Sequence, residues 1–128
     1  MTFQYSVAVR NAKLDAEQTA IGPSPIMRIF SGAEPLNCAA ADPSGLLCTI
    51  TLPAVWMSPS VNGIKSLAGT WSNTSSASGA IACWRIYDST GTTCHIQGNT
   101  NDMTFTSVNI ISGRLITVVT FQITSGNS

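Results

Sequence analysis

Apolar and polar residues alternate on both sides of a short turn between residues 80 and 98. Both runs are rich in β-branched and aromatic residues, and a three-residue loop ending at Gly91 suits a turn that needs a left-handed backbone position. This loop would pair residues of one apolar face, namely Trp84 with Ile96 and Ile86 with Cys94. The opposite face would carry Cys83, Arg85, Tyr87, His95 and Gln97. The pattern therefore predicts a β-hairpin with one apolar and one largely polar face.

The N-terminal segment changes from an alternating to a helical pattern. Residues 2–9 alternate and suit an N-terminal strand or arm. Asn11 is a favourable N-cap for a helix over residues 12–21, and a helix that begins near Ser6 is the alternative. The Gly-Pro pair that follows ends the helix in either case, because proline cannot continue it.

The rest of the chain reads as short strands separated by turn residues. We expect strands over residues 26–30, 46–52, 64–71, 103–110 and 115–124, with loops over 31–44 and 72–79. These patterns predict a mainly β fold, a β-sandwich or jelly-roll-like antiparallel domain with one N-terminal helix. Residues 1–21 would form an arm and helix, and residues 22–128 a single β-sandwich domain.

Charge is scarce in this chain of 128 residues, with six acidic and six basic side chains and a formal net charge of zero. The basic residues are scattered, so we expect no nucleic-acid partner, because phosphate binding needs clustered positive charge. The sequence has no apolar run of membrane-spanning length and no signal-peptide pattern at its start, so we expect no membrane partner and synthesis in a cytoplasm. Low net charge favours self-association, which indicates a homo-oligomer.

Side chains that carry chemistry are few, with four cysteines and one histidine. The cysteine spacings do not match a zinc site, and we expect no metal and no cofactor. Cys94 and His95 are adjacent, so on a strand they point to opposite faces and cannot form a catalytic pair. No nucleophile elbow or phosphate loop is present, so we expect no catalytic residues and no enzyme activity.

The cysteines leave two readings open. In the predicted hairpin Cys94 faces the core, where Cys48 also lies, and Cys38 belongs to a loop that could cover it. A disulfide of Cys94 with Cys38 or Cys48 is one reading, and the candidate pair is Cys38 with Cys94. Free thiols that pack as small apolar side chains are the alternative, and a cytoplasmic origin favours them.

Several apolar residues outside the clear strands are candidate contacts with a partner. Trp56 and Met57 lie in an irregular segment, and tryptophan and methionine are enriched at interfaces. The N-terminal arm and helix add further candidates, namely Phe3, Tyr5, Val7 and Leu14. Exposed tryptophan and tyrosine rings could also stack on sugars, which is the alternative for Trp56.

The order of several stretches resembles a family of small structural proteins of tailed bacteriophages and prophages. The stretches are residues 10–16 with Ile21-Gly22, Met27-Arg28-Ile29 followed by Gly32 and Pro35, Trp84-Arg85-Ile86 with Asp88 and Gly91-Thr92-Thr93, Gly98 with Asp102-Met103, and residues 119–127. They span nearly the whole chain, and none of them is diagnostic of an activity by itself. The family is similar to capsid decoration (cement) proteins and is sometimes labelled as tail or fibre proteins.

The resemblance implies a non-enzymatic virion protein on the outer capsid surface. Its partner would be the major capsid protein, and it would act as a homo-oligomer, with a trimer favoured. Buried apolar area between subunits would then stabilise the shell. The alternative is a tail, fibre or vertex module that binds a host receptor or glycan.

Overall fold

The computed structural model describes residues 3–125. The described residues begin with a short arm, which is followed by helix α1 (Val7–Ile21). Ser6 is the N-cap, and its hydroxyl oxygen accepts a hydrogen bond of 3.2 Å from the Val9 N–H. The start near Ser6 is thus confirmed, and a strand reaching Val9 is wrong, because the serine cap and the alanines that follow favour a helix. The helix ends at Gly22, whose φ of 88° suits glycine.

Four antiparallel strands form the first sheet in the order β2-β1-β6-β7. The expected strands over 26–30 and 46–52 are confirmed, with one residue less in the second. The bounds are β1 (Ile26–Phe30), β2 (Leu46–Thr51), β6 (Cys83–Tyr87) and β7 (Cys94–Asn99). Each of these strands is antiparallel to its neighbours, which suits one continuous core face.

The β6–β7 hairpin is confirmed, but its register differs from the expected one. Ile86 lies opposite Ile96 rather than Cys94, and a bulge between Ile86 and Tyr87 places Tyr87 opposite Cys94. The cause lies in the turn, where the Asp88 carboxylate accepts hydrogen bonds from backbone N–H groups of the loop and lengthens it. Cys94 therefore lies on the same face as Tyr87 and not on the core face.

The longest strand, β10 (Leu115–Thr124), joins the short strands of the second sheet. Its first residues pair with β4 (Ser72–Thr74), its last with β3 (Ile64–Ser66), and its middle with β8 (Met103–Phe105). A separate pair consists of β5 (Gly79–Ala80) and β9 (Asn109–Ile110). The strands expected over 64–71 and 103–110 are thus shorter or divided, and the expected loop 72–79 contains β4 and the first residue of β5.

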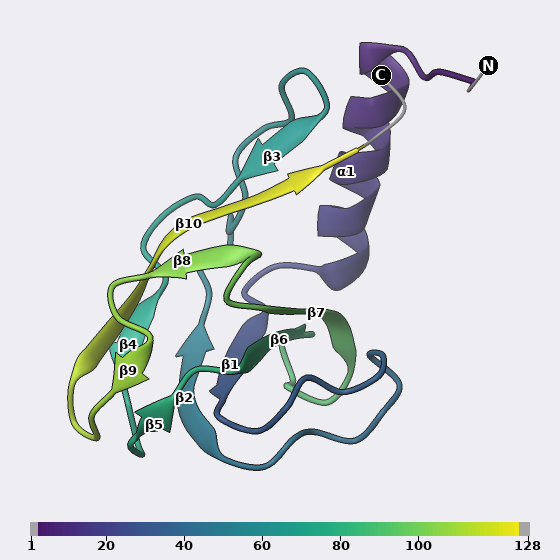
Figure 1. Ribbon diagram of the computed structural model, residues 1–128. Helices are drawn as coiled ribbons and strands as arrows, with labels where there is room; N and C mark the ends of the chain where they lie inside the picture. The colour runs from purple at the N-terminus through teal and green to yellow at the C-terminus, as the bar shows by residue number, and fades with distance from the viewer. Residues whose placement is uncertain (1–2, 126–128) are drawn as a thin grey trace.

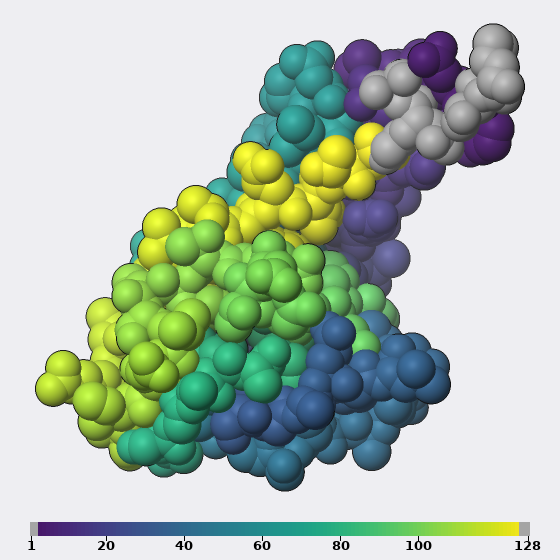
Figure 2. All heavy atoms as spheres, viewed as in Figure 1, coloured from purple at the N-terminus to yellow at the C-terminus, as the bar shows by residue number. Residues whose placement is uncertain are grey.

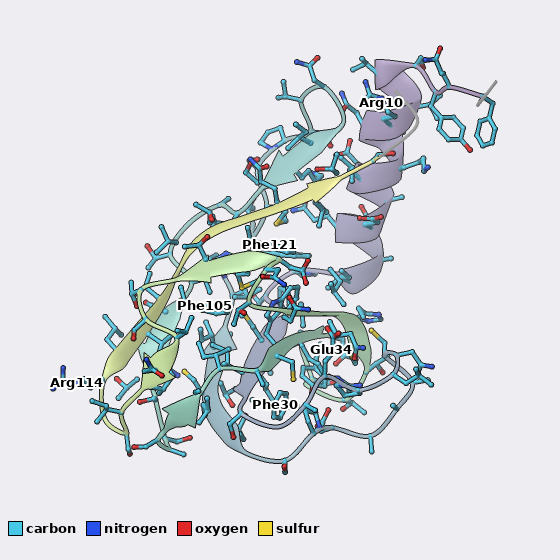
Figure 3. All side chains as sticks on the ribbon, in the orientation of Figure 1. Arg10, Phe30, Glu34, Phe105, Arg114 and Phe121 are labelled. Atoms are coloured by element: carbon cyan, nitrogen blue, oxygen red, sulfur yellow. The ribbon has the colours of Figure 1, made fainter. Side chains whose placement is uncertain are left out.

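The core lies between the first sheet and the β10 sheet, and aromatic rings fill its centre. The Phe121 ring centroid lies 5.7 Å from that of Trp71 and 5.3 Å from that of Trp84. Figure 3 shows Phe121 and Phe105 directed into this body from the strands that carry them. The protein is mainly β, with antiparallel sheets and one N-terminal helix in the described part, consistent with a β-sandwich-like domain.

The second face of the first sheet is covered as well, which the alternation did not predict. All five residues of β6 are buried, because the long loop over residues 31–45 lies across the face that carries Arg85 and Tyr87. His95 is exposed, as expected for a surface residue. The loop covering this face explains why a strand with polar residues lies fully inside the molecule.

The molecule is elongated, as Figures 1 and 2 show. Helix α1 and the hairpin before β3 lie at one end, and the turn that carries Arg114 lies at the other (Figure 3). Strand β10 runs between these ends (Figure 1). Within residues 3–125 no helix has the length and apolar character to cross a membrane.

Candidate functional site

The arm and the first turn of α1 carry the expected contact residues that are accessible. Phe3 is 62% exposed and Val7 is 42% exposed, while Tyr5 is partly buried. The Phe3 and Tyr5 rings meet edge to face with centroids 5.3 Å apart, and the Lys13 ammonium lies 4.4 Å from the Tyr5 ring centroid. These contacts order the arm on the surface of the helix, with Phe3 turned to solvent.

The other expected contact residues are buried within the chain, so the expectation that they form exposed contacts is wrong. Leu14, Trp56 and Met57 are each at most 1% exposed. The Trp56 ring lies 6.0 Å from that of Trp71, and its N–H donates to the Gly22 carbonyl at 3.0 Å. The segment around Trp56 has no periodic pattern that could show which of its side chains face inward.

Burial also excludes a sugar-stacking platform built on tryptophan. Each of the three tryptophans is at most 1% exposed, and each ring N–H donates to a backbone carbonyl. A ring that stacks on a sugar must present one face to solvent, and these rings do not.

Helix α1 is fixed to strand β3 by polar side chains around the buried Lys65. The Lys65 ammonium lies 3.0 Å from the Asp15 carboxylate and donates to the Gln18 side chain at 2.7 Å and to the Ser58 carbonyl at 2.9 Å. The Ser60 hydroxyl and the Lys65 ammonium lower the pKa of Asp15 by hydrogen bonding to its carboxylate. Asp15 and Gln18 lie more than 40 residues from Lys65 in the chain, so no local pattern marks these contacts.

The N-terminal turn of α1 is held by the turn before β3. The Asn11 side chain accepts the Gly63 N–H at 2.8 Å, and the Arg10 guanidinium donates to the Asn62 carbonyl at 3.2 Å. Gly63 has a φ of 73°, and a Cβ there would lie 2.4 Å from Arg10. Glycine therefore permits both the turn and the close approach of the helix.

One end of the molecule consequently exposes a set of apolar side chains, which we name the apical surface. Its members come from the arm and helix and from the neighbouring hairpin, and they are Phe3, Val7, Val9, Val61 and Ile64. The contacts of Arg10 and Asn11 with the hairpin bring these two segments to the same end (Figure 2). Several exposed apolar side chains at one end of the molecule make that end a candidate interaction surface.

A second feature is the anchor of loop 31–45, formed by the buried guanidinium of Arg85. This side chain is 2% exposed and lies 2.8 Å from the Asp42 carboxylate. It also donates to the carbonyls of Asn37 and Ala40, both at 3.0 Å, and to the Gln97 side chain. We name this arrangement the Arg85 anchor; it satisfies a buried charge while it fixes the loop.

The Asp42 carboxylate also accepts a hydrogen bond from the Tyr87 hydroxyl. Partial burial alone would raise the pKa of Asp42, but the hydrogen bonds from Tyr87 and Arg85 outweigh it and lower the pKa. Burial, together with the Asp42 hydrogen bond, raises the pKa of Tyr87 to about 12. Such a phenol stays protonated at neutral pH, which makes it a poor general base there.

An open hollow of about 600 Å³ lies beside the Arg85 anchor and is lined on one side by the loop and on the other by the hairpin. Cys38 and Cys94 both line this hollow, and Cys38 adds to the effect of burial in raising the pKa of Cys94. The structure therefore brings together the candidate disulfide pair, although all four cysteines are free thiols here. Cys94 reaches Cys38 because it lies on the loop-covered face, opposite to the expected core face.

The remaining thiols lie apart from this pair and contact backbone carbonyls. Cys48 donates to the Asn73 and Thr74 carbonyls, both at 3.7 Å, and Cys83 donates to the Gly32 carbonyl at 3.3 Å. Burial raises the pKa of both thiols. Between residues 3 and 125, no group of three or more His, Cys, Asp or Glu side chains is placed to hold a metal ion.

Comparison of the chain with protein-family models, curated proteins and solved structures gives no match.

Proposed function

We propose that this chain is a non-enzymatic structural protein of a tailed-bacteriophage virion. In this proposal it is a capsid decoration (cement) protein that forms a homotrimer on the outer capsid surface. It binds the major capsid protein and holds neighbouring capsid subunits together. The virion is its final location, after synthesis in the cytoplasm of the bacterial host.

The observation that carries this proposal is the apical surface. Phe3, Val7 and Val61 keep 42–62% of their surface exposed although the same chain buries three tryptophans completely. Burying such side chains in an interface contributes about 1.5–3 kcal/mol each before the costs of association. A surface of this kind suits a protein that works by adhesion.

The low charge of the chain supports the same proposal. Charged residues make up 9% of the sequence, and the two ion pairs found in residues 3–125 each use a buried basic side chain for internal anchoring. Few free charges remain to repel neighbouring copies at the high local density of a virion surface. The resemblance of several sequence stretches, in their order, to small phage structural proteins supports the same proposal.

The first test is the oligomeric state of the purified chain and of variants of the apical surface. We expect the wild-type protein to have about three times the 13.4 kDa chain mass in light scattering coupled to size exclusion. The double substitution Phe3→Ser with Val7→Ser removes two exposed side chains and is expected to weaken self-association by about 10–100-fold. A wild-type protein that is monomeric at every concentration would contradict the trimer.

A matched control is available in loop 31–45. Leu36 is 93% exposed and lies outside the apical surface, so Leu36→Ser makes a similar change in polarity elsewhere. We expect this variant to assemble like the wild-type protein. Equal effects of both substitutions would show that general surface polarity, and not the apical surface, controls association.

The second test is the copy number of the chain in purified virions, measured by quantitative mass spectrometry against the major capsid protein. A ratio near one, or a simple fraction of one, is the result that a decoration protein gives. A handful of copies per virion would favour the alternative, a tail, fibre or vertex module that binds a receptor or glycan. Absence from the virion would refute both.

A further inference from the structure

We propose that Cys38 and Cys94 are a redox pair that forms an intrachain disulfide and covalently fastens loop 31–45 to strand β7. The oxidant we name is a small-molecule disulfide such as oxidised glutathione. The proposal concerns the covalent state of this chain alone, so it does not depend on the proposed function.

The Arg85 anchor positions the loop before any disulfide forms. Arg85 donates to the carbonyls of Asn37 and Ala40, the residues on both sides of the Cys38-Ala39 pair. Asn37 also closes this turn, since its side chain accepts the N–H groups of Ala39 and Ala40 at 3.0 and 3.1 Å. Cys38 therefore belongs to a short segment that is fixed at both ends.

The hairpin in turn positions Cys94. Tyr87 lies opposite Cys94 in the hairpin, and the Tyr87 hydroxyl binds the same Asp42 carboxylate that Arg85 contacts. Anchor, loop and Cys94 thus share one face of the sheet, and Cys38 and Cys94 line the same hollow. Neither Cys48, which lies in the core, nor Cys83, which donates to the Gly32 carbonyl, lines this hollow.

The reaction has a defined order. Burial, together with the neighbouring Cys38, raises the pKa of Cys94 to about 12, which disfavours its thiolate, so we assign the first attack to Cys38. The Cys38 thiol loses its proton and its sulfur attacks one sulfur of oxidised glutathione, which breaks that S–S bond and releases one glutathione. The Cys94 thiol then loses its proton and attacks the Cys38 sulfur, which releases the second glutathione. In sum, two protein thiols become one disulfide, and one oxidised glutathione takes up the electron pair and becomes two thiols.

The consequence is a loop that is held by a covalent bond as well as by hydrogen bonds. The bond closes a chain segment from residue 38 to residue 94, and a loop of this length restricts the unfolded chain strongly. We expect the melting temperature to rise by roughly 5–15 °C on oxidation. Cleavage of loop 31–45 by thermolysin should slow by about tenfold or more, because local opening is suppressed.

The experiment compares the wild-type protein after incubation with dithiothreitol or with oxidised glutathione. We expect the intact mass to fall by about 2 Da on oxidation, the mass of the two hydrogens removed. Digestion with chymotrypsin and trypsin without reduction assigns the bond. Chymotrypsin cuts between Cys38 and Cys48 at Leu46 and Leu47, and trypsin cuts after Arg85, which separates Cys83 from Cys94. A linked peptide pair containing Cys38 and Cys94 is the expected result.

Variants give an independent readout of stability. Cys38→Ser is expected to abolish both the mass change and the rise in melting temperature, whereas Cys48→Ala is expected to retain both. A linked peptide that contains Cys48 or Cys83, a bond between two chains, a glutathione adduct that persists on Cys38, or an unchanged mass would each overturn the proposal. Peptide mapping of the wild-type protein keeps the test decisive if a variant does not fold.

Discussion

Replacing Arg85 with methionine removes the guanidinium that anchors loop 31–45 and keeps a side chain of similar length. The substitution removes the donor to the Gln97 amide oxygen and to the carbonyls of Asn37 and Ala40, and it leaves the Asp42 carboxylate with the Tyr87 hydroxyl as its side-chain donor. Methionine still fills the space along the sheet, so the change tests the polar contacts more than the packing.

The expected loss of unfolding free energy depends on how fully water can solvate the groups that lose Arg85 as their donor. Removing one partner of a fully buried ion pair costs about 3–5 kcal/mol. The Asp42 side chain is 47% exposed, so water can solvate it again, and the electrostatic part must be discounted. The two loop carbonyls also reach solvent once the loop opens. We therefore expect Arg85→Met to lower the free energy of unfolding by about 2–4 kcal/mol.

Two assays separate local release of the loop from global unfolding. Urea denaturation followed by tryptophan fluorescence reports the core, because all three tryptophans are buried there. Thermolysin digestion reports the loop, and we expect cleavage in residues 31–45 to accelerate by more than the global loss of stability accounts for. Arg114→Met, at an exposed arginine, is the control and should change either readout little.

An Arg85→Met variant that is as stable as the wild type and is cleaved at the same rate would contradict this prediction. That result would mean that loop 31–45 keeps its place through other contacts. A global loss without faster loop cleavage would show instead that Arg85 supports the sheet rather than the loop.

Three further predictions concern other parts of the molecule. The pKa of Tyr87 is raised from 10.0 to about 12, so its protonated hydroxyl stabilises the folded state fully below pH 10, and this stabilisation is lost as the pH rises towards 12. Ultraviolet titration of the wild type and of Tyr87→Phe measures the ionisation of this tyrosine. Lys65→Met should speed hydrogen exchange in α1 and cost about 1–3 kcal/mol, whereas Lys13→Met should not, since Lys13 is exposed. Gly98→Ala places a Cβ 2.5 Å from the Trp84 ring and should cost about 1–3 kcal/mol in thermal unfolding.

The sequence predicted the strands of five or more residues, but it did not show whether one or both faces of each strand are buried. Residues 26–30 and 115–124 form β1 and β10 with the expected bounds. Alternation works there because side chains on a strand point to opposite faces in turn. Strands of two or three residues, such as β5 and β9, are too short to show a period and depend on their partners for their existence.

The hairpin register depends on side-chain contacts in the turn, which the pattern of apolar and polar residues does not show. The faces were assigned on the assumption of a three-residue loop, but the Asp88 side chain gathers the N–H groups of Thr92 and Thr93 and shifts the pairing. A shift of this kind moves Cys94 to the other face, which a pattern of residue types cannot reveal. It also removes the contact that a core-facing Cys94 would have made with Cys48.

Buried polar residues were the other features that the sequence could not place. Arg85 and Lys65 have partners that lie 43 to 48 and 47 residues away, respectively. Arginine and lysine are ordinarily exposed, so without their distant partners nothing marks them as buried. Phe3 and Val7, by contrast, belong to the alternating segment 2–9 that the sequence predicts as a strand or arm, and both are exposed.

Strand β10 has a consequence for how the chain folds as it is made. It follows β3, β4 and β8 in the sequence, yet it supplies the neighbour to which each of them is bonded. During synthesis these earlier strands lack β10 as their hydrogen-bonding neighbour until residues 115–124 leave the ribosome. The second layer of the sandwich therefore closes only after translation of its last strand, and long-range pairing of this kind is slow compared with helix formation.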